Sequence, residues 1–562
     1  MSAATGGTPG LSANLRDRAL RWIADDPCAA DRAELQHVLA AAKGGSAPDL
    51  TELTARMQGP LAFGTAGLRG PLRAGPAGMN LAVVRRAAAG IAAYLRTTEG
   101  EGGTVVIGYD ARHRSAEFAG DAAKTLAAAG FRVLLAGEAL PTPITAFAVR
   151  SLDAIAGLQI TASHNPPQDN GLKVYLRGGT QLVGPSDVAI EAAIEAGPPA
   201  VSIDTAGQPL PWPADLLDAY TARAAGLATG MSRDLRVAAT PLHGVGGRTL
   251  VQTLHLAGFD DIHIVGSQAA PDPNFPTVAF PNPEEPGACE ELLALAERVG
   301  ADLAIANDPD ADRCAIGIRG ADDVWRMLSG DETGSLLGDL LLARLDRSAQ
   351  PDALVATTIV SSQLLGKIAA ARSVRYDQTL TGFKWIVRAG DGEGTGLVFG
   401  YEEALGLAVD PNAVRDKDGI SAAVLACDLA ATLRTKGRTL DDALDDLARA
   451  HGLHTTGAVS LRVQDLTQIA RWMAELRADL PTKLLGEDVH ATELLPSTDG
   501  IRLQTDRIRV VIRPSGTEPK LKCYLEIVTP VPAEFPDVGA AQARAGQAMT
   551  ELRREVESLF RP

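Results

Sequence analysis

Thr161-Ala162-Ser163-His164-Asn165-Pro166-Pro167 follows directly on the apolar run Ile155-Ala156-Gly157-Leu158-Gln159-Ile160 and says more about the architecture than any other part of the chain. An apolar run that ends in a sudden polar turn is typical of a buried strand in an α/β protein, where reactive groups lie at the carboxyl ends of strands. The two prolines stiffen the exit of the turn and lower its entropy. Ser163 is therefore predicted to be held rigidly at a strand end, where its hydroxyl can carry a phosphoryl group.

Strand-like apolar runs alternate with Ala- and Leu-rich helical stretches along most of the 562 residues. Such alternation predicts an α/β fold with βαβ units and largely parallel sheets, in three successive units of similar plan. The clearest predicted strands are 104–108, 131–135, 235–239, 302–306 and 353–357, and the clearest helices are 118–129 and 333–345.

Proline- and glycine-rich segments divide the chain near residues 197–213, 318–320 and 437–452. After the last of these the pattern becomes antiparallel α+β, with predicted strands at 458–463, 501–503, 507–512 and 521–527, and residues 15–42 are predicted to be helices added before the first unit. The predicted domains are 1–210, which includes the N-terminal helices, 211–322, 323–445 and 446–562.

Composition and charge exclude several classes of function. A net charge of −16 disfavours a nucleic-acid backbone as partner. The five cysteines form no CxxC pair and their number is odd, which fits reduced thiols in a cytosol. No stretch approaches the ~18 apolar residues of a membrane span, and the first 14 residues lack a signal pattern. These features predict a soluble, cytoplasmic protein without nucleic-acid or membrane partners, and no pattern indicates its oligomeric state.

Asn307-Asp308-Pro309-Asp310-Ala311-Asp312-Arg313 also follows an apolar strand. Three carboxylates at alternate positions converge on a hard cation, and ligation by oxygen alone favours Mg²⁺ over zinc. An EF-hand loop is rejected because its sixth and twelfth positions would be Arg313 and Arg319 instead of glycine and glutamate. The alternative is a solvated acidic turn, which three aspartates followed by an arginine disfavour.

Arg513-Pro514-Ser515-Gly516-Thr517-Glu518-Pro519-Lys520 follows the predicted strand 507–512. Arginine offers a planar fork to a phosphate, the two hydroxyls donate beside it, and Gly516 allows a backbone N–H to come close. A turn between two strands of an edge hairpin explains the segment equally well.

Three further segments indicate a function only in combination with the other motifs. Gly400-Tyr401-Glu402-Glu403-Ala404-Leu405-Gly406 offers two glutamates that could accept hydrogen bonds from vicinal sugar hydroxyls, although an acidic helix N-terminus is equally natural. Gly64-Thr65-Ala66-Gly67-Leu68-Arg69-Gly70 and Thr381-Gly382-Phe383-Lys384 each combine glycine with one cation, as a phosphate clamp or a linker would. The first of these lacks the Lys-Ser/Thr ending of a Walker loop.

In this combination and order the segments resemble one family, the α-D-phosphohexomutases, which comprises phosphoglucomutases, phosphomannomutases and relatives. The resemblance runs from about residue 63 to 524, and TASHNPP, DPDADR, the EE-containing loop and RPSGTEP look like its four signature segments. It implies three related α/β domains with mixed, largely parallel sheets and a smaller C-terminal α+β domain around a central cleft. GFGTAGLRG, QDNGLKVY and GFKWI look most like the longer branch that includes phosphopentomutases and sugar-bisphosphate synthases.

The resemblance assigns roles to particular residues. It implies that Ser163 is a phosphoserine and that Asp308, Asp310 and Asp312 bind a Mg²⁺ that also touches the serine phosphate. It places Arg69, His164, Lys173 and Lys384 around the transfer site. It assigns binding of the substrate to Arg313, Thr381, Gly382, Glu402 and Glu403. It assigns binding of the nonreacting phosphate to Arg513, Ser515, Gly516 and Thr517.

The implied activity is interconversion of hexose 1-phosphate and hexose 6-phosphate, of mannose or glucose, through the phosphoserine and a sugar 1,6-bisphosphate. A phosphopentomutase acting on ribose or deoxyribose phosphates and a sugar-bisphosphate synthase are the alternatives. Ala404 and Leu405 depart from the Glu-Glu-Ser-Gly loop of the family, and Phe383 stands where some members carry histidine. The sugar preference therefore stays open.

Lys173 is the predicted general base, with His164 as a second group that orients the phosphoserine or moves protons. Strand alternation sets Lys173 and Tyr175 opposite their apolar neighbours, and Asn170-Gly171 is predicted to be a turn that returns Lys173 toward Ser163. A base requires a lowered pKa, which Arg69 and the metal would provide. A solvent-facing strand lysine is the alternative.

Two other classes are compatible with parts of the sequence. Asp308-Pro309-Asp310 after a strand mimics the aspartyl nucleophile of a haloacid-dehalogenase-like phosphatase, but that class does not explain the third aspartate, the serine loop or the phosphate clamp. A sugar-phosphate sensor without catalysis would be expected to lack Ser163 or an aspartate, and none is missing.

Overall fold

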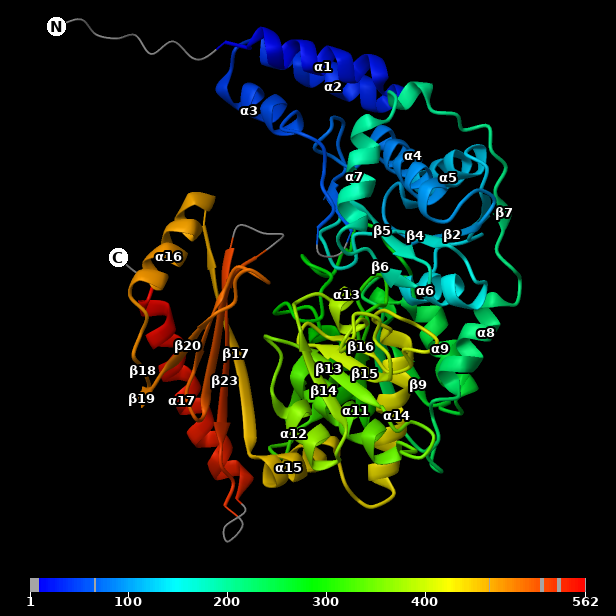
Figure 1. Ribbon diagram of the computed structural model, residues 1–562. Helices are drawn as coiled ribbons and strands as arrows, with labels where there is room; N and C mark the ends of the chain where they lie inside the picture. The colour runs from blue at the N-terminus through cyan, green and yellow to red at the C-terminus, as the bar shows by residue number, and fades with distance from the viewer. Residues whose placement is uncertain (1–9, 65–66, 464, 516–519, 533–536, 561–562) are drawn as a thin grey trace, which may run out of the picture.

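The computed structural model describes residues 10–64, 67–463, 465–515, 520–532 and 537–560. Three α/β units follow one another and a smaller antiparallel unit ends the chain (Figure 1), which confirms the predicted fold class. Three helices precede the first sheet and share a small core of their own: α1 (Ala13–Asp25), α2 (Ala29–Lys43) and α3 (Ala47–Arg56).

The first sheet has the order β1-β5-β4-β2-β3-β7, with β6 paired to β5. Its strands are β1 (Leu68–Pro71), β2 (Thr104–Tyr109), β3 (Arg132–Leu135), β4 (Ala156–Ile160), β5 (Asp169–Leu176), β6 (Thr180–Gln181) and β7 (Leu210–Pro211). Its helices are α4 (Leu81–Thr98), α5 (Ser115–Ala128), α6 (Thr142–Ser151) and α7 (Ser186–Ala196), with a 3₁₀ turn at Ala200–Ser202.

The second sheet has the order β12-β11-β10-β8-β9. Its elements are α8 (Leu216–Ala225), β8 (Val237–Thr240), α9 (Gly246–Leu256), β9 (Ile262–Ile264), a 3₁₀ turn at Gly266–Gln268, α10 (Glu290–Val299), β10 (Leu303–Ala306), β11 (Ala315–Arg319) and β12 (Trp325–Met327).

The third sheet has the order β14-β13-β15-β16. Its elements are α11 (Gly330–Arg344), β13 (Leu354–Thr358), α12 (Leu364–Ala371), β14 (Arg375–Thr379), α13 (Phe383–Ile386), β15 (Leu397–Glu402), β16 (Gly406–Ala408), α14 (Gly419–Arg434) and α15 (Leu440–His451).

The three sheets share one plan, as the sequence suggested. In each, a central strand pairs in parallel with two neighbours, and the third strand then pairs with an antiparallel fourth, which gives β3-β2-β4-β5, β9-β8-β10-β11 and β14-β13-β15-β16. The loops that join the third strand to the fourth are therefore equivalent. They carry Ser163, the three aspartates and the glutamate pair, respectively.

None of the three predicted boundaries falls between units. The boundary at 210 divides β7, which pairs with β3 of the first sheet. The boundary at 322 lies inside the second sheet, because β12 pairs with β11. The boundary at 445 lies inside α15, which continues to His451 before β17 begins. The segment at 322 is a turn between two paired strands, and most of the segment at 445 is helix.

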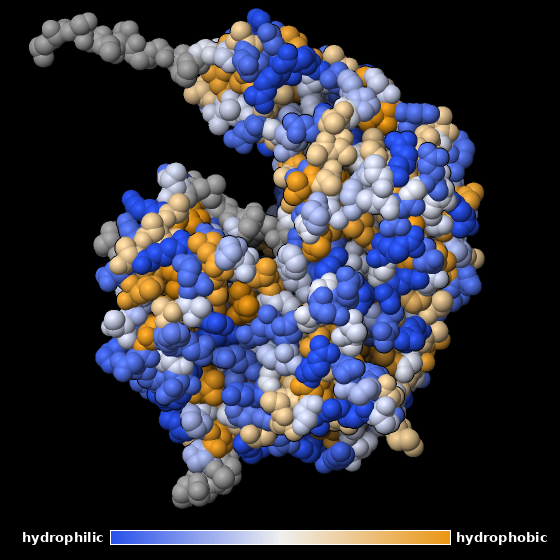
Figure 2. Space-filling model, in the orientation of Figure 1, coloured by the Kyte–Doolittle hydropathy of each residue, from blue (hydrophilic) through white to orange (hydrophobic). Residues whose placement is uncertain are grey.

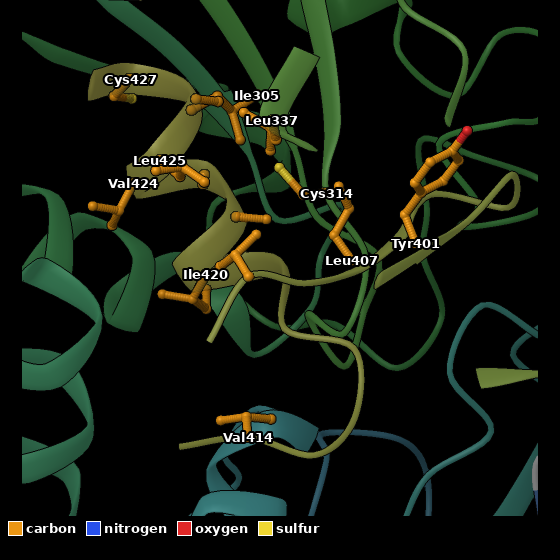
Figure 3. Packing of buried hydrophobic residues seen from close by; sticks show 14 of the residues in the cluster. Ile305, Cys314, Leu337, Tyr401, Leu407, Val414, Ile420, Val424, Leu425 and Cys427 are labelled. Atoms are coloured by element: carbon orange, nitrogen blue, oxygen red, sulfur yellow. The ribbon is translucent and has the colours of Figure 1, made fainter. Parts of the chain in front are cut away.

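One hydrophobic core joins the second and third units. Figure 3 shows Ile305 of β10, Leu337 of α11 and Leu407 of β16 packed around the side chains of α14. Almost every residue of α14 is buried, and a helix that is apolar on all sides belongs in an interior. The aspartate loop and the glutamate loop are thus fixed to the same core.

The last unit has a core of its own and the sheet order β17-β23-β22-β21-β20. Its elements are β17 (Leu453–Arg462), α16 (Leu466–Ala478), β18 (Lys483–Leu484), β19 (Glu487–Asp488), β20 (His490–Glu493), β21 (Ile501–Gln504), β22 (Ile508–Pro514), β23 (Lys520–Thr529) and α17 (Val538–Ser558). A deep hollow separates this unit from the N-terminal helices (Figure 2). All five cysteines are free, and no helix in the described ranges is both long and apolar enough to span a bilayer.

Candidate active site

Ser163 lies in the loop that follows β4, and only 2% of it is exposed. Its backbone has φ 54°, a left-handed conformation that is uncommon outside glycine, and its N–H donates to Thr161 Oγ1 at 2.8 Å. The hydroxyl donates to Asp308 Oδ2 at 2.9 Å and lies 3.2 Å from His164 Nδ1. The structure therefore brings together a serine and an aspartate that are 145 residues apart.

Arg112 holds the serine loop in this shape. Its guanidinium donates to four main-chain carbonyls of the loop, among them those of Ser163 at 2.6 Å and Pro166 at 2.8 Å. The side chain is buried, lies 3.4 Å from Asp110 and stacks on Phe275 of the second unit. A planar fork with five donors is suited to gathering several carbonyls at once.

The three aspartates after β10 form a buried cluster whose ligand oxygens all lie within 4.8 Å of one another. Burial, reinforced by Asp310 and Asp312, raises the pKa of Asp308 well above 3.8. Burial acts on Asp310 and Asp312 in the same direction, but Lys173 outweighs it and lowers the pKa of both. The cluster is thus a set of crowded carboxylates that only cations can stabilise.

The cluster fits a divalent cation. Asp310 Oδ1 and Asp312 Oδ1 are buried without a hydrogen-bond partner among the described residues. An unpaired carboxylate oxygen in the interior is costly, and a bound cation satisfies it. A donor set of carboxylate oxygens without nitrogen or sulfur suits a hard ion.

Lys173 lies in the interior beside the aspartates, unlike the solvent-facing strand lysine that was the alternative. It is fully buried, so the solvent-facing alternative is wrong, and its Nζ lies 2.7 Å from both Asp310 Oδ2 and Asp312 Oδ2. Burial lowers its pKa, the two aspartates raise it further, and the net shift among the described residues is upward. The lowering of this pKa by a bound metal stays a prediction. Asn170-Gly171 is also no turn, because both residues lie inside β5, where Gly171 pairs with Arg69 of β1.

Three arginines offer buried donors to the cleft. The Nε atoms of Arg69, Arg313 and Arg513 are buried without a partner in the described structure. Arg313 is anchored by Asn282 at 3.2 Å and Glu284 at 3.1 Å. Burial, with Arg313 and Arg69, holds the pKa of His164 well below 6.5, so the imidazole is neutral near pH 7. Such orphaned donors indicate that an anion belongs here.

The two glutamates differ in their surroundings. Glu403 accepts hydrogen bonds from Thr358 at 3.1 Å and Ser361 at 2.9 Å, whereas burial raises the pKa of Glu402 to about 7. No helix begins here, because Leu405 (φ 65°) turns the chain directly into β16. The helix-terminus alternative is therefore wrong.

Lys417, which the sequence analysis did not single out, lies where Lys384 was expected. Its Nζ is 3.3 Å from Asp312 and lies over the ring of Phe383. Lys384 stands in α13 near Asp187 and Arg388, and no hydrogen bond between described residues joins it, Thr381 or Gly382 to the aspartates. Those three residues stay predictions.

The RPSGTEP segment joins β22 to β23, which are inner strands of their sheet, so the edge-hairpin alternative is wrong. Ser515 N donates to Lys520 O at 2.8 Å, which closes the hairpin. Gly516 and Thr517 lie outside the described residues.

The sequence did contain signals for the missed residues. Asp110 and Arg112 follow the predicted strand 104–108 in the same way that Ser163 follows its own strand. Lys417 precedes Gly419, where a Cβ would lie 2.1 Å from Arg313 O, so a glycine is needed beside the aspartate loop. Thr142, which donates to Asp310 Oδ2 at 2.5 Å, follows only a proline and carries no such signal.

Comparisons with known proteins agree with this geometry. Family models match in order: phosphoglucomutase/phosphomannomutase alpha/beta/alpha domains I (residues 60–200), II (217–320) and III (329–451), and the C-terminal domain (462–533). The chain is 41% identical over 461 residues to a Haemophilus influenzae protein named "Probable phosphomannomutase", covering 80% of this chain and 93% of that one. It is 34% identical over 510 residues to the phosphoglucomutase of Staphylococcus aureus strain N315, covering 85% and 91%.

Among solved structures, a phosphoglucomutase/phosphomannomutase family protein from Burkholderia thailandensis superposes with a TM-score of 0.67 at 21% identity, covering 88% of this chain and 97% of that one. Fold, site and relatives together define a phosphosugar mutase. The chain belongs to the phosphoglucomutase/phosphomannomutase family.

Proposed function

We propose that this protein interconverts hexose 1-phosphate and hexose 6-phosphate, of mannose or glucose, and that Ser163 carries the transferred phosphoryl group. The P–Oγ bond of phospho-Ser163 breaks as a bond forms to one sugar hydroxyl, which gives a sugar 1,6-bisphosphate. The bisphosphate turns over in the cleft and returns its other phosphoryl group to Ser163.

One observation supports this proposal above the others. Ser163 Oγ lies 2.9 Å from Asp308, and the neighbouring Asp310 and Asp312 each present a buried oxygen without a partner. We infer that Asp308, Asp310 and Asp312 hold Mg²⁺, which supplies positive charge opposite the phosphoryl oxygens. The cytoplasmic location stays a prediction.

The remaining residues align and stabilise the reactants. We assign to Arg69 and Arg313 the binding of the phosphoryl oxygens, and to Arg513 the binding of the nonreacting phosphate. The Nε atoms of these arginines are buried without partners in the described structure. Lys417 and Lys173 keep the carboxylates in place. The proton of the accepting hydroxyl passes to His164, whose imidazole is neutral near pH 7, or to Lys173, which must first give up the proton that it shares with Asp310 and Asp312.

Phosphorylation of Ser163 is tested directly. Purified protein is incubated with Mg²⁺ and glucose 1,6-bisphosphate, digested and analysed by mass spectrometry. The peptide that contains Ser163 is expected to gain about 80 Da, the mass of one phosphate ester. An unmodified peptide, from protein that is active as a mutase, would contradict the proposal.

Ser163→Ala is expected to lower kcat by at least about a thousandfold with an unchanged circular dichroism spectrum, because the covalent carrier is lost. Ser267→Ala, which removes an exposed hydroxyl that donates to Glu291, is the matched control and is expected to be fully active. Measuring kcat/KM on mannose, glucose and ribose 1-phosphates then ranks the sugars.

A further inference from the structure

A surface pocket of about 570 Å³ lies outside the catalytic cleft, where three units meet. The C-terminal end of α6 and the turn after β5 contribute from the first unit, α8 from the second, and the loop between β16 and α14 from the third. In Figure 1, α6 and α8 lie side by side below the first sheet. Neither the serine nor the aspartate cluster lines this pocket.

The pocket is positively charged although the chain has a net charge of −16. Arg150, Arg177 and Arg223 line it, and the only acidic residue in its lining is Asp153. Arg177 bonds to Glu99 and Asp153, and Arg223 bonds to Asp410 at 2.6 Å. Carboxylates therefore neutralise these two arginines in part.

Arg150 has no carboxylate partner among the described residues. Its Nε donates to Asn412 O at 3.0 Å and its Nη1 to Gly178 O at 2.8 Å, both main-chain oxygens. Burial lowers the pKa of Arg150, and the neighbouring Arg415 lowers it further, while Asp410 compensates only in part. A half-buried cation beside other cations is destabilised unless an anion is near.

The rest of the lining suits a small organic molecule. Phe147, Val149, Ala219 and Ala413 add apolar groups to the lining. A volume of about 570 Å³ lies within the range of small-molecule sites. Guanidinium groups recognise phosphate by paired hydrogen bonds, and apolar groups recognise the body of the molecule that carries it.

We propose that this pocket, lined by Arg150, Arg177 and Arg223, is a second anion site that binds a phosphate monoester of a small metabolite. The inference goes beyond the mutase reaction and does not depend on it. A ligand that contacts both Arg150 and Arg223 bridges the first and second units and therefore favours the arrangement in which these units are close.

A site-resolved experiment separates this pocket from the catalytic cleft. Phenylglyoxal modifies accessible arginines, and peptide mass spectrometry gives the modification rate of each one. Glucose 6-phosphate and AMP are the phosphate monoesters tested, inorganic phosphate is tested beside them, and chloride of equal ionic strength is the reference. At saturation either monoester is expected to slow the modification of Arg177 and Arg223 by at least about fivefold.

Arg248 is the internal control. It is exposed and paired with Glu138, as Arg223 is paired with Asp410, but it lies outside the pocket. Its modification rate is expected to stay the same. Equal rates for Arg177 and Arg223 with and without the monoesters would overturn the proposal, as would equal protection of Arg248.

Variants test whether the three arginines act as one site. Arg150→Gln is expected to abolish protection of Arg177 and Arg223. Arg177→Gln, at a side chain that is 48% exposed, provides the same test at Arg223 in case Arg150→Gln does not fold. Retained protection in both variants would contradict a shared site. Protection by inorganic phosphate alone would assign the pocket to free phosphate and refute the monoester.

Discussion

Arg112 holds the main chain around the nucleophile Ser163. It gathers the carbonyls of Ser163, Asn165, Pro166 and Asp169, which fixes a loop whose serine has a left-handed backbone. Lysine keeps the charge but cannot reach several carbonyls from one plane. Arg112 is thus a positioning residue for phosphoryl transfer.

Arg112→Lys is expected to lower kcat by about a hundredfold while KM stays within about twofold, because misplacement of the reacting atom affects the transition state more than substrate binding. Steady-state kinetics with hexose 1-phosphate measures both constants. Arg248→Lys, at an exposed ion pair, is the control. A parental kcat in Arg112→Lys would show that the loop holds its shape without the guanidinium fork.

The aspartate cluster leads to a prediction about the metal. Carboxylates crowded in the interior destabilise the protein by mutual repulsion, and a cation that binds only the native state stabilises it by mass action. Mg²⁺ is therefore expected to raise Tm by a few degrees, and EDTA to reverse the rise. Differential scanning calorimetry of the parent and Asp310→Asn tests this expectation.

Asp310→Asn is expected to lose the Mg²⁺-dependent rise, whereas Asp446→Asn, on the acidic surface of α15, is expected to keep it. An equal rise in all three proteins would show that Mg²⁺ acts elsewhere.

The sequence revealed the residues that stand at the ends of long apolar strands. Ser163 and the aspartates belong to this class, and the structure places them in contact. Lys417 was missed because β16 has only three residues, too few for a period to be recognised. The surroundings of Lys173 were not predicted, because only the tertiary structure shows that two aspartates bind its ammonium group.

Among the elements, α11 begins with a buried carboxylate. Ser329 and Glu332 form a capping box, and between them Asp331 accepts a hydrogen bond from the Ser362 N–H at 2.6 Å and one from the Tyr401 hydroxyl at 3.2 Å. Burial raises the pKa of Asp331 from 3.8 to about 7, against the effect of the Ser362 hydrogen bond. The native state therefore binds this proton more tightly than the unfolded chain does.

A raised carboxyl pKa makes the free energy of unfolding fall as pH rises from about 4 to about 7, by up to about 4 kcal/mol for this group, after which it levels off. Asp331→Asn keeps the Oδ1 acceptor and removes the charge. We expect the variant to match the parent near pH 5 and to have a higher Tm at pH 8.

Asp322→Asn, at an exposed turn, is the control for this measurement. A Tm difference between Asp331→Asn and the parent that is the same at pH 5 and pH 8 would show that Asp331 does not titrate in this range.

On the scale of the whole molecule, three copies of one sheet plan explain why the site forms at all. Equivalent loops from three units point into one cleft, and the alternation of strands and helices was enough to predict those units. The boundaries at β12 and α15 were missed, since the glycine-containing segments before them resemble linkers in the sequence.

Polar contacts of Glu526 join the fourth unit, which carries the proposed phosphate clamp, to the third unit. Glu526 of β23 is buried, accepts hydrogen bonds from Ser362 Oγ at 2.7 Å and Gln363 N at 2.8 Å in the third unit, and pairs with Arg509 at 2.9 Å. Burial opposes its ionisation, but Arg509 and His454 lower its pKa to about 2. The strands that carry these residues also carry Arg513.

Glu526→Gln is expected to leave the Arg509 charge buried without its partner, which costs about 3–5 kcal/mol and loosens the fourth unit. KM for hexose 1-phosphate is expected to rise about tenfold, because the clamp no longer meets the distal phosphate, while the Mg²⁺-dependent rise in Tm persists. Glu493→Gln, at the exposed pair with Arg477 in the same sheet, is the matched control and is expected to keep the parental KM. If KM is unchanged in Glu526→Gln, or rises equally in both variants, then the contacts of Glu526 do not position the clamp, and the fourth unit is held over the cleft by other interactions.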